Sequence, residues 1–420
     1  MSAARESRMQ LVAAGLTLAV LWALATTVGP FSDTTVNDLY VYRTYAELLT
    51  AGQLPYLDFA FEYPPLAALP LGLAGLPGSA EQTYAVSFAV LMAGCALGGQ
   101  QLAARLAGAT DSLACVPAGG GVSGGVVVAW LLALSPIIIG ASLRTHFDAL
   151  PIAIALGALL ALARGRTNVG FLLLGLGTMT KLFPGLLAVV AIAWLVARGD
   201  RVAAARGGAI FVAVLLAISL PFAGSGYVDS FRFHLERPVQ IESSAASVLF
   251  ALGGSEVTGT KLRPDRFKSN GLDGGHADAV ELAFALALVL VLAAIVALAA
   301  RHSAPRHMVL CGFAALLAFV TLGKVFSPQY VIWLAPFTAL AWVWRERAVA
   351  LLVGAAIVLT HVEFPSRYFD LINERHGVIW IVSARNGLLA AALIVLVARL
   401  LQAPAAEPCR ESRRVGSLPR

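Results

Sequence analysis

The chain has 420 residues, of which 59% are hydrophobic and only 13% are charged. Soluble globular proteins are about half apolar and about a quarter charged, so this composition excludes a water-soluble enzyme, and the scarcity of charge excludes a disordered chain. The mean hydropathy is +0.79. We therefore predict an all-α polytopic membrane protein, because about 20 apolar residues cross a bilayer as one helix.

Apolar segments of spanning length, or slightly shorter, recur along the whole chain. They predict about twelve transmembrane helices, with 168–197 forming either two spans or one bent element. The predicted spans cover residues 9–30, 83–104, 121–139, 148–163, 168–181, 182–197, 207–223, 277–300, 307–323, 329–344, 348–362 and 377–401.

The distribution of charge predicts the side of the membrane on which each loop lies. One set of alternating loops carries only arginine as its basic residue, whereas the other set holds most acidic residues and all four lysines. By the positive-inside rule, the arginine-only set is cytoplasmic. We predict a multi-pass protein of the plasma membrane with both termini inside. Residues 1–401 form one membrane unit, and 402–420 form a basic cytoplasmic tail.

Three loops on the predicted outer side are longer or more polar than a connection requires, and such loops are usually functional. They cover 31–82, 224–276 and 361–376. In the first loop, residues 38–49 have the apolar spacing of a helix lying along the surface. The proline-rich segment 64–77 predicts a short re-entrant or slanted helix. Because all three loops lie on one side, they can converge on one site.

Several polar motifs, in order along the chain, resemble those of a known family. They read DLYVY at 38–42, GQLPYLDF at 52–59, EYPPLA at 62–67, LSPIIIGASLRTHFDALP at 134–151, TMTKLFPGLL at 178–187, FRFHLERPVQIES at 231–243 and SPQYVIWLAPF at 327–337. Together they resemble the GT-C glycosyltransferases, and among them family 87, the polyprenol-phosphomannose-dependent mannosyltransferases. One departure is that the family's Arg-Phe-Asp run reads Arg-Thr-His-Phe-Asp at 144–148, so which basic group takes the arginine's role stays open.

The resemblance implies a GT-C fold with its active site on the outer side. It implies a polyprenyl-phosphate sugar donor, with mannose as the sugar, and a glycolipid or glycan acceptor that the motifs do not identify. It also implies that Asp38 is the catalytic base, with Asp58 and Glu62 as second-rank acids. The residues alone favour an N-cap role for Asp38 and a turn role for Asp58.

Polar residues of the outer side are the predicted ligands of the donor phosphate and sugar, because charge-assisted hydrogen bonds stabilise a leaving phosphate. They are Arg144, His146, Lys181, Arg232, His234, Arg237, Gln240, Lys324 and Gln329. Structural alternatives stay open for several of them. Lys181 can snorkel from a helix end, and Arg144 can pair with Asp148 four residues later. Lys324 and Gln329 can flank a proline turn.

The sequence contains neither an Asp-x-Asp pair nor a His-x-x-x-His motif, so we predict a transferase that needs no metal or other cofactor. Its expected partners are the lipid-linked donor, the acceptor and membrane lipids, and no nucleic acid. Two alternative functions are a transporter or flippase of a lipid-linked sugar, and an O-antigen-type ligase that works without an acidic base. Neither alternative requires the acid-rich first loop.

Overall fold

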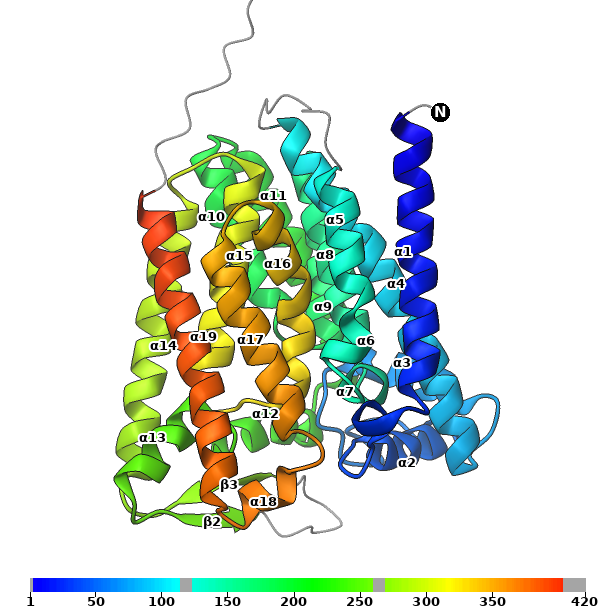
Figure 1. Ribbon diagram of the computed structural model, residues 1–420, viewed down its shortest axis with the longest axis vertical. Helices are drawn as coiled ribbons and strands as arrows, with labels where there is room; N and C mark the ends of the chain where they lie inside the picture. The colour runs from blue at the N-terminus through cyan, green and yellow to red at the C-terminus, as the bar shows by residue number, and fades with distance from the viewer. Residues whose placement is uncertain (1–2, 114–122, 260–268, 403–420) are drawn as a thin grey trace, which may run out of the picture.

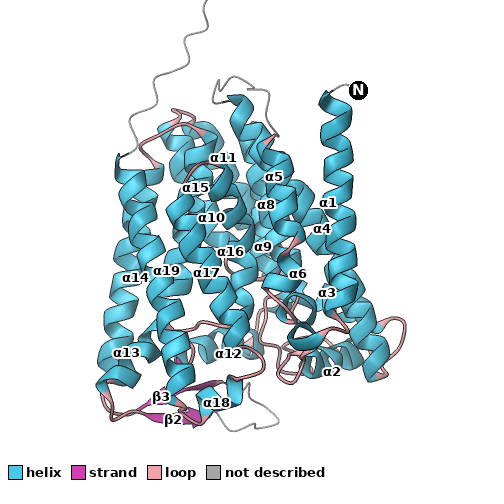
Figure 2. Ribbon diagram, in the orientation of Figure 1, coloured by secondary structure: helices cyan, strands magenta, loops and turns pink. Residues whose placement is uncertain are grey.

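A computed structural model describes residues 3–113, 123–259 and 269–402. Most of the described chain is a bundle of α-helices that run along one axis of the molecule (Figure 1). The start of α1 and the end of α19 lie at one end of this bundle, whereas short helices and a small sheet collect at the other end (Figure 2). The predicted all-α polytopic fold is confirmed.

A helix, or a pair of helices, lies at each predicted span. They are α1 (Ala3–Ala25), α4 (Glu81–Leu113), α5 (Gly124–Ala133) with α6 (Ser135–Ile138), α8 (Ala149–Ala163), α9 (Thr167–Thr180), α10 (Pro184–Ala197), α11 (Arg201–Ser219), α14 (Ala277–Ala299), α15 (Pro305–Leu322), α16 (Val331–Val343), α17 (Arg347–Glu363) and α19 (His376–Gln402). Within the described residues, six helices are long and apolar enough to cross a membrane: α1, α4, α11, α14, α15 and α19. The others are shorter, so a count of twelve crossings stays a prediction.

The segment 168–197 forms two helices rather than one bent element. Helix α9 ends at Thr180, and Lys181 has an extended backbone with φ −157° and ψ 140°. Helix α10 then begins at Pro184. Proline cannot continue a helix, because it lacks an N–H group and its ring clashes with the preceding turn. The break therefore leaves Lys181 in a non-helical link between two apolar helices.

The first predicted outer loop contains two short helical regions. Helix α2 (Leu39–Thr50) matches the predicted surface helix and buries Tyr42, Tyr45 and Ala46. The 3₁₀ helix η2 (Pro65–Ala67) and helix α3 (Ala68–Gly75) form the predicted short apolar helix, which is too short to cross a bilayer. Helices α2 and α3 pack closely, because a Cβ atom added at Gly75 would lie 2.8 Å from the Cβ of Ala46.

The second predicted outer loop contains helices α12 (Ser225–Glu236) and α13 (Ser244–Leu252) and a three-stranded antiparallel sheet of order β1-β3-β2. Its strands are β1 (Val239–Gln240), β2 (Glu256–Gly259) and β3 (Asn270–Asp273). The sequence analysis missed this sheet, because strands of two to four residues carry too little alternation to be recognised. The remaining short elements are η1 (Gly29–Ser32), α7 (Ser142–Thr145), η3 (Leu220–Phe222), η4 (Pro328–Tyr330) and α18 (Tyr368–Ile372).

The three predicted outer loops meet at the end of the bundle opposite the N-terminus, where Figure 1 places α2, α12, α13, α18 and the sheet. Which side of the membrane this end faces stays a prediction, as does the division into one membrane unit and a tail. Residues 403–420 lie outside the described residues, as do two of the four lysines, Lys261 and Lys268.

The bundle is held by a continuous apolar core in which α4 packs on α8, α8 on α9 and α17 on α19. Helix α15 is enclosed by its neighbours, and 78% of its 18-residue apolar stretch is buried. In α14 only 17% of the corresponding stretch is buried. An apolar helix that the protein leaves so exposed is covered by lipid in a membrane protein. Helix α14 therefore forms part of the lipid-facing surface.

Candidate active site

A cavity of about 1400 Å³ lies where the loops meet the bundle. Residues from all three predicted outer loops line it, among them Asp38, Arg237 and Tyr368. Its size exceeds the usual range for small-molecule sites, which is about 300–1000 Å³, and it is therefore large enough for two substrates. Nine of the predicted site residues line it: Asp38, Glu62, His146, Lys181, His234, Arg237, Gln240, Lys324 and Gln329.

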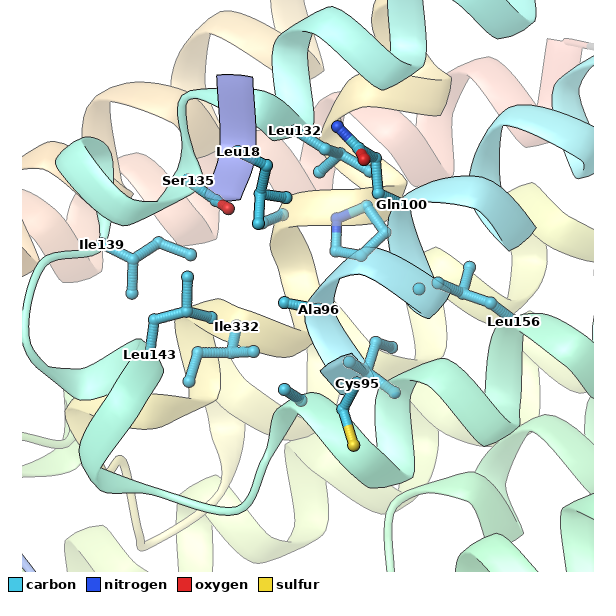
Figure 3. Close-up of a pocket in the computed structure, with 15 residues that line it drawn as sticks. Leu18, Cys95, Ala96, Gln100, Leu132, Ser135, Ile139, Leu143, Leu156 and Ile332 are labelled. Carbon is cyan, nitrogen blue, oxygen red and sulfur yellow. The ribbon is translucent and has the colours of Figure 1, made fainter. Parts of the chain in front are cut away.

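A second cavity, of about 40 Å³, lies inside the bundle between α1, α4, α8 and α16 (Figure 3). Its lining is mostly apolar, with Gln100 and Ser135 as the main polar side chains. A single water molecule occupies about 30 Å³ in the liquid. This cavity is therefore too small for a sugar and is not a candidate for the site.

Asp38 directly precedes helix α2 but does not cap it through its side chain. Asn37 precedes it, and its Oδ1 accepts a hydrogen bond of 2.8 Å from the backbone N–H of Leu39, the first residue of the helix. The Asp38 carboxylate instead accepts a 3.2 Å hydrogen bond from the hydroxyl of Tyr42. Its side chain is 37% exposed and lines the cavity. The Asp38 side chain therefore forms no capping hydrogen bond, while its position at the N-terminus of α2 also suits the helix dipole.

His146 lies beside Asp38, with its Nε2 3.4 Å from Asp38 Oδ2. The other ring nitrogen, Nδ1, is 3.0 Å from the hydroxyl oxygen of Thr145 and 3.2 Å from the carbonyl oxygen of Ser142. These contacts on both sides fix the orientation of the ring. The His146 side chain is almost wholly buried, so it presents only its edge to Asp38 and the cavity.

Asp148 is the residue of this region that the sequence analysis failed to place in the site. It is fully buried, and the Nζ of Lys181 donates to both of its carboxylate oxygens, at 2.7 and 2.8 Å. The indole Nε1 of Trp333 donates a third bond, of 2.5 Å. The expected alternative pairing of Arg144 with Asp148 is wrong, because Arg144 donates to the carbonyl oxygen of Phe31 at 2.7 Å and does not line the cavity.

Lys181 does not snorkel to solvent, because its ammonium is held by Asp148 and surrounded by aromatic rings. It lies 4.6 Å from the ring centroid of Phe147 and 5.6 Å from that of Trp333. Its side chain keeps 12% exposure, toward the cavity. Lys181 therefore contributes positive potential to the cavity while remaining paired.

The two second-rank acids occupy different environments. Asp58 is exposed, accepts a 2.7 Å bond from the backbone N–H of Leu54 within a turn, and does not line the cavity. Glu62 does line the cavity. Burial, followed by the nearby charge of Asp38, raises the pKa of Glu62 to about 7, so its carboxyl group exchanges a proton near neutral pH.

The basic residues of the second loop also differ in environment, because one lies on the surface and two line the cavity. Arg232 is exposed and pairs with Asp229 at 3.1 Å on the surface of α12. Arg237 follows α12 and lines the cavity, and its buried Nε has no hydrogen-bond partner in the part of the chain that the structure describes. The Nε2 of His234 donates a 3.1 Å hydrogen bond to the carbonyl oxygen of Glu62. Burial, and then the charge of Arg237, lowers the pKa of His234, so it is neutral at pH 7.

The remaining predicted ligands line another part of the cavity. The Nζ of Lys324 pairs with Glu281 at 2.8 Å and donates to the carbonyl oxygen of Leu235 at 2.6 Å. Gln240 donates to Glu242 at 3.0 Å, and Gln329 lies in η4 at the cavity wall. Among the described residues that line the cavity, Arg237 is therefore the arginine or lysine that forms no ion pair.

Comparison with known proteins decides the family. The sequence model of glycosyltransferase family 87 matches residues 61–328, which is more than half of the chain. The chain belongs to glycosyltransferase family 87. The resemblance drawn from the motifs is confirmed, and the protein is a membrane glycosyltransferase.

Among solved structures, this family 87 chain is similar to one described as the crystal structure of ArnT from Cupriavidus metallidurans in the apo state. The two are 15% identical, the similarity covers 95% of this chain and 78% of that chain, and the TM-score is 0.46. A search of curated protein sequences found no match.

The range matched to glycosyltransferase family 87 contains most of the polar cavity residues, but it begins after Asp38 and ends before Gln329. The position of Asp38 in the site is therefore supported by its geometry rather than by the match. Several cavity residues were missed by the sequence analysis, namely Tyr63, Glu242, Asn270, Glu281, Tyr330, Trp333 and Tyr368. A signal existed for Tyr63, Glu242, Tyr330 and Trp333, which lie in the quoted motifs, whereas nothing in the pattern distinguished Asn270 or Tyr368.

Proposed function

We propose that this family 87 enzyme transfers mannose from a polyprenyl monophosphate donor to a hydroxyl group of a glycolipid or glycan at the outer face of the plasma membrane. One observation carries the proposal. The Asp38 carboxylate caps nothing and opens onto a large cavity that also holds Arg237 without an ion pair among the described residues. A base and a free cation in one cavity are what glycosyl transfer from a lipid phosphate requires.

In the proposed step, Asp38 accepts the proton of the acceptor hydroxyl as the oxygen attacks C1 of the donor sugar. The new C1–O bond forms on the face opposite the C1–O bond to phosphate, which breaks, and the electron pair leaves with the polyprenyl phosphate. The single displacement inverts the anomeric centre. His146, 3.4 Å from Asp38 Oδ2, and Tyr42 hold the carboxylate in place.

The leaving phosphate is assigned to the side of the cavity where the cations lie. Arg237 supplies a guanidinium that forms no ion pair with any described residue, and Lys181 supplies a second positive group that stays bound to Asp148. A guanidinium can bind a phosphate through two parallel hydrogen bonds. The charge that develops on the phosphate as the C1–O bond breaks is thereby stabilised in place of a metal ion.

The lipid tail of the donor is assigned to the apolar side of the cavity. Ala285 and Leu288 of α14 line it together with Phe319 and Leu322 of α15. Because α14 is exposed along most of its length, a polyprenyl chain can pass from the bilayer along this helix into the cavity. The phosphate would then enter at the depth of Lys324 and Arg237.

Two other functions use the same cavity. A flippase would need the lipid groove and the cations but no base, and the family 87 match favours a transferase over it. An O-antigen-type ligase also works without an acidic base. The uncapped Asp38 carboxylate therefore separates the proposed enzyme from both alternatives.

The test is Asp38→Asn in purified protein supplied with polyprenyl-phosphate-mannose and membrane acceptors. The amide keeps the size of the side chain and can still bond Tyr42, but it cannot accept the proton. Because general-base catalysis contributes typically 10²–10⁴-fold, transfer should fall by at least about 100-fold. Donor binding and protein yield should stay near the wild-type level.

Asp58→Asn is the matched control, since Asp58 lies in the same loop but outside the cavity. Its effect on transfer should be small. Retention of more than about a tenth of the activity by Asp38→Asn would contradict the assignment, because that loss is smaller than removal of a general base produces. Glu62 would then be the next acid to test.

A further inference from the structure

The wall of the cavity formed by β1, β3 and α18 is polar but differs in charge from the wall that holds Arg237 and Lys181. Gln240, Asn270 and Tyr368 line it with partly exposed side chains. Asn270 Nδ2 donates a 2.9 Å hydrogen bond to the hydroxyl oxygen of Tyr368, which leaves the Tyr368 O–H free to donate. The amide oxygen of Gln240 is buried and has no hydrogen-bond partner among the described residues.

Behind this wall lies a buried charged cluster that the proposed transfer does not use. Arg385 and Glu363 are both fully buried, with Nη1 3.6 Å from Oε2. Arg385 also donates to the backbone carbonyl of Glu242. The side-chain Oε1 of Glu242 is buried and has no partner among the described residues. Burial, followed by the charge of Glu363, raises the pKa of Glu242. Arg385 is fully buried and does not line the cavity, so it presents no positive charge there to an anionic ligand.

An apolar face accompanies these polar groups. Phe364 and Phe369 also line the cavity, and their rings lie 5.8 and 6.0 Å from that of Tyr368. Phe369 is 56% exposed. Uncharged hydrogen-bonding groups beside an exposed aromatic ring suit a sugar, which has hydroxyl groups at its edge and C–H groups on its faces.

A chain of contacts connects this wall to the proposed base. Asp38 contacts His146 at 3.4 Å, the His146 ring lies 6.4 Å from that of Phe364, and Phe364 contacts Tyr368. The Ser366 hydroxyl also donates a 2.6 Å bond to Asp33, just before Asp38. Arg237 and Lys181 act electrostatically on Glu62, and neither belongs to this chain of contacts.

We propose that Gln240, Asn270 and Tyr368 form a subsite for an uncharged sugar ring, and that this ring belongs to the acceptor. The inference rests on the proposed function, because it takes Asp38 as the group that meets the acceptor hydroxyl. The donor phosphate is assigned to Arg237 and Lys181, so the uncharged groups of Gln240, Asn270 and Tyr368 are left for the acceptor. The subsite therefore selects neutral glycans and disfavours uronic acids and phosphorylated sugars.

Binding experiments on the purified full chain in nanodiscs test this without requiring catalysis. The probes are neutral methyl glycosides of mannose, glucose and galactose, methyl glucuronide as the anionic counterpart, and radiolabelled polyprenyl phosphate. Saturation-transfer NMR measures the glycosides, and retention on the protein measures the lipid. The variants are Tyr368→Phe and Asn270→Ala at the wall, Arg237→Gln on the cationic side, and Tyr84→Phe as a matched control outside the cavity.

At least one neutral glycoside should bind the wild type, and the glucuronide should bind at least about tenfold more weakly. Tyr368→Phe and Asn270→Ala should each weaken the neutral glycoside about tenfold, as loss of one hydrogen bond does, and should leave polyprenyl phosphate binding unchanged. Arg237→Gln should weaken binding of polyprenyl phosphate and leave binding of the neutral glycoside unchanged. Tyr84→Phe should change the binding of neither ligand.

The subsite is overturned if no neutral glycoside binds, or if the two wall variants bind it as the wild type does. The choice of acceptor is overturned if those variants instead weaken binding of polyprenyl-phosphate-mannose more than that of polyprenyl phosphate, because the wall then holds the donor sugar. Wild-type protein that binds the glycoside but no polyprenyl phosphate would contradict the proposed donor and still support the neutral subsite.

Discussion

Asp38 and Asp148 are two aspartates beside the same cavity, and their surroundings differ sharply. Asp148 is fully buried and receives three bonds of 2.5–2.8 Å from Lys181 and Trp333. Asp38 is 37% exposed and has two longer contacts, of 3.2 and 3.4 Å. A buried carboxylate whose two oxygens are both bonded by donors stabilises the fold, whereas a carboxylate with few contacts that faces a cavity is available to a substrate hydroxyl group.

The largest effect expected from this difference is on stability. Asp148→Asn should leave Lys181 buried without its counter-charge, and breaking a buried ion pair costs about 3–5 kcal/mol. The melting temperature of the purified protein in detergent should therefore drop clearly. Asp38→Asn should leave it nearly unchanged.

The double variant Asp148→Asn with Lys181→Met sharpens the comparison, because it removes both charges and should recover much of the lost stability. If Asp148→Asn melts like the wild type, the description of Asp148 as a structural anchor is contradicted. If Asp38→Asn is as unstable as Asp148→Asn, the distinction between the two aspartates fails.

The same distinction applies to two arginines five residues apart. Arg232 is satisfied by Asp229 on the surface, whereas Arg237 faces the cavity without an ion pair among the described residues. Charged hydrogen bonds contribute about 1.5–3 kcal/mol, so Arg237→Gln should weaken polyprenyl phosphate binding by at least about tenfold. Arg232→Gln should change it by less than about twofold, since exposed pairs contribute little. Equal losses in a lipid-binding assay would contradict the assignment.

Glu62 also lines the cavity, and its carboxyl group should make donor binding depend on pH. Its pKa of about 7 leaves the carboxyl group neutral below that value and ionised above it. The phosphodiester of the donor stays anionic throughout, so ionised Glu62 repels it, and binding should weaken a few-fold between about pH 6 and pH 8. Glu62→Gln should abolish this dependence. A pH profile that is unchanged in the variant would remove Glu62 from the site.

The smallest effect is expected from chelation. The cavity supplies positive charge through Arg237 and Lys181, and the sequence contains no Asp-x-Asp pair that would hold a nucleotide-bound metal. Transfer measured with EDTA should match transfer without it to within about twofold, a change too small to indicate loss of an essential group. Complete loss with EDTA, restored by magnesium or manganese, would contradict the proposed use of side-chain cations.

Much of the fold could be predicted from sequence because a bilayer imposes a strong and regular hydrophobic pattern. Helix boundaries matched closely where apolar runs are long, as at α14, and where proline interrupts them, as at Pro184. The small sheet of β1, β2 and β3 was missed, because its pairing joins segments too short to show alternation.

The candidate site was only partly predictable, for a different physical reason. Charged residues such as Arg237 and Lys181 could be found, because charge beside apolar segments is conspicuous. The sequence could not show which of these charges are paired, because the partners are distant in sequence. Asp148, for example, precedes Lys181 by 33 positions. Neutral groups such as Asn270 and Tyr368 carry no signal until the fold brings them to one wall.

The most direct test of the central claim is transfer by purified protein from a synthetic donor. Radiolabelled polyprenyl-phosphate-mannose would be incubated with membrane acceptors and either the wild-type protein or Asp38→Asn, with labelled GDP-mannose as the alternative donor. The account predicts that the wild type moves label from the lipid donor to the acceptor with inversion at the anomeric carbon, and that GDP-mannose is not used. Transfer from GDP-mannose, or protein-dependent movement of the lipid donor across the bilayer without transfer, would contradict it.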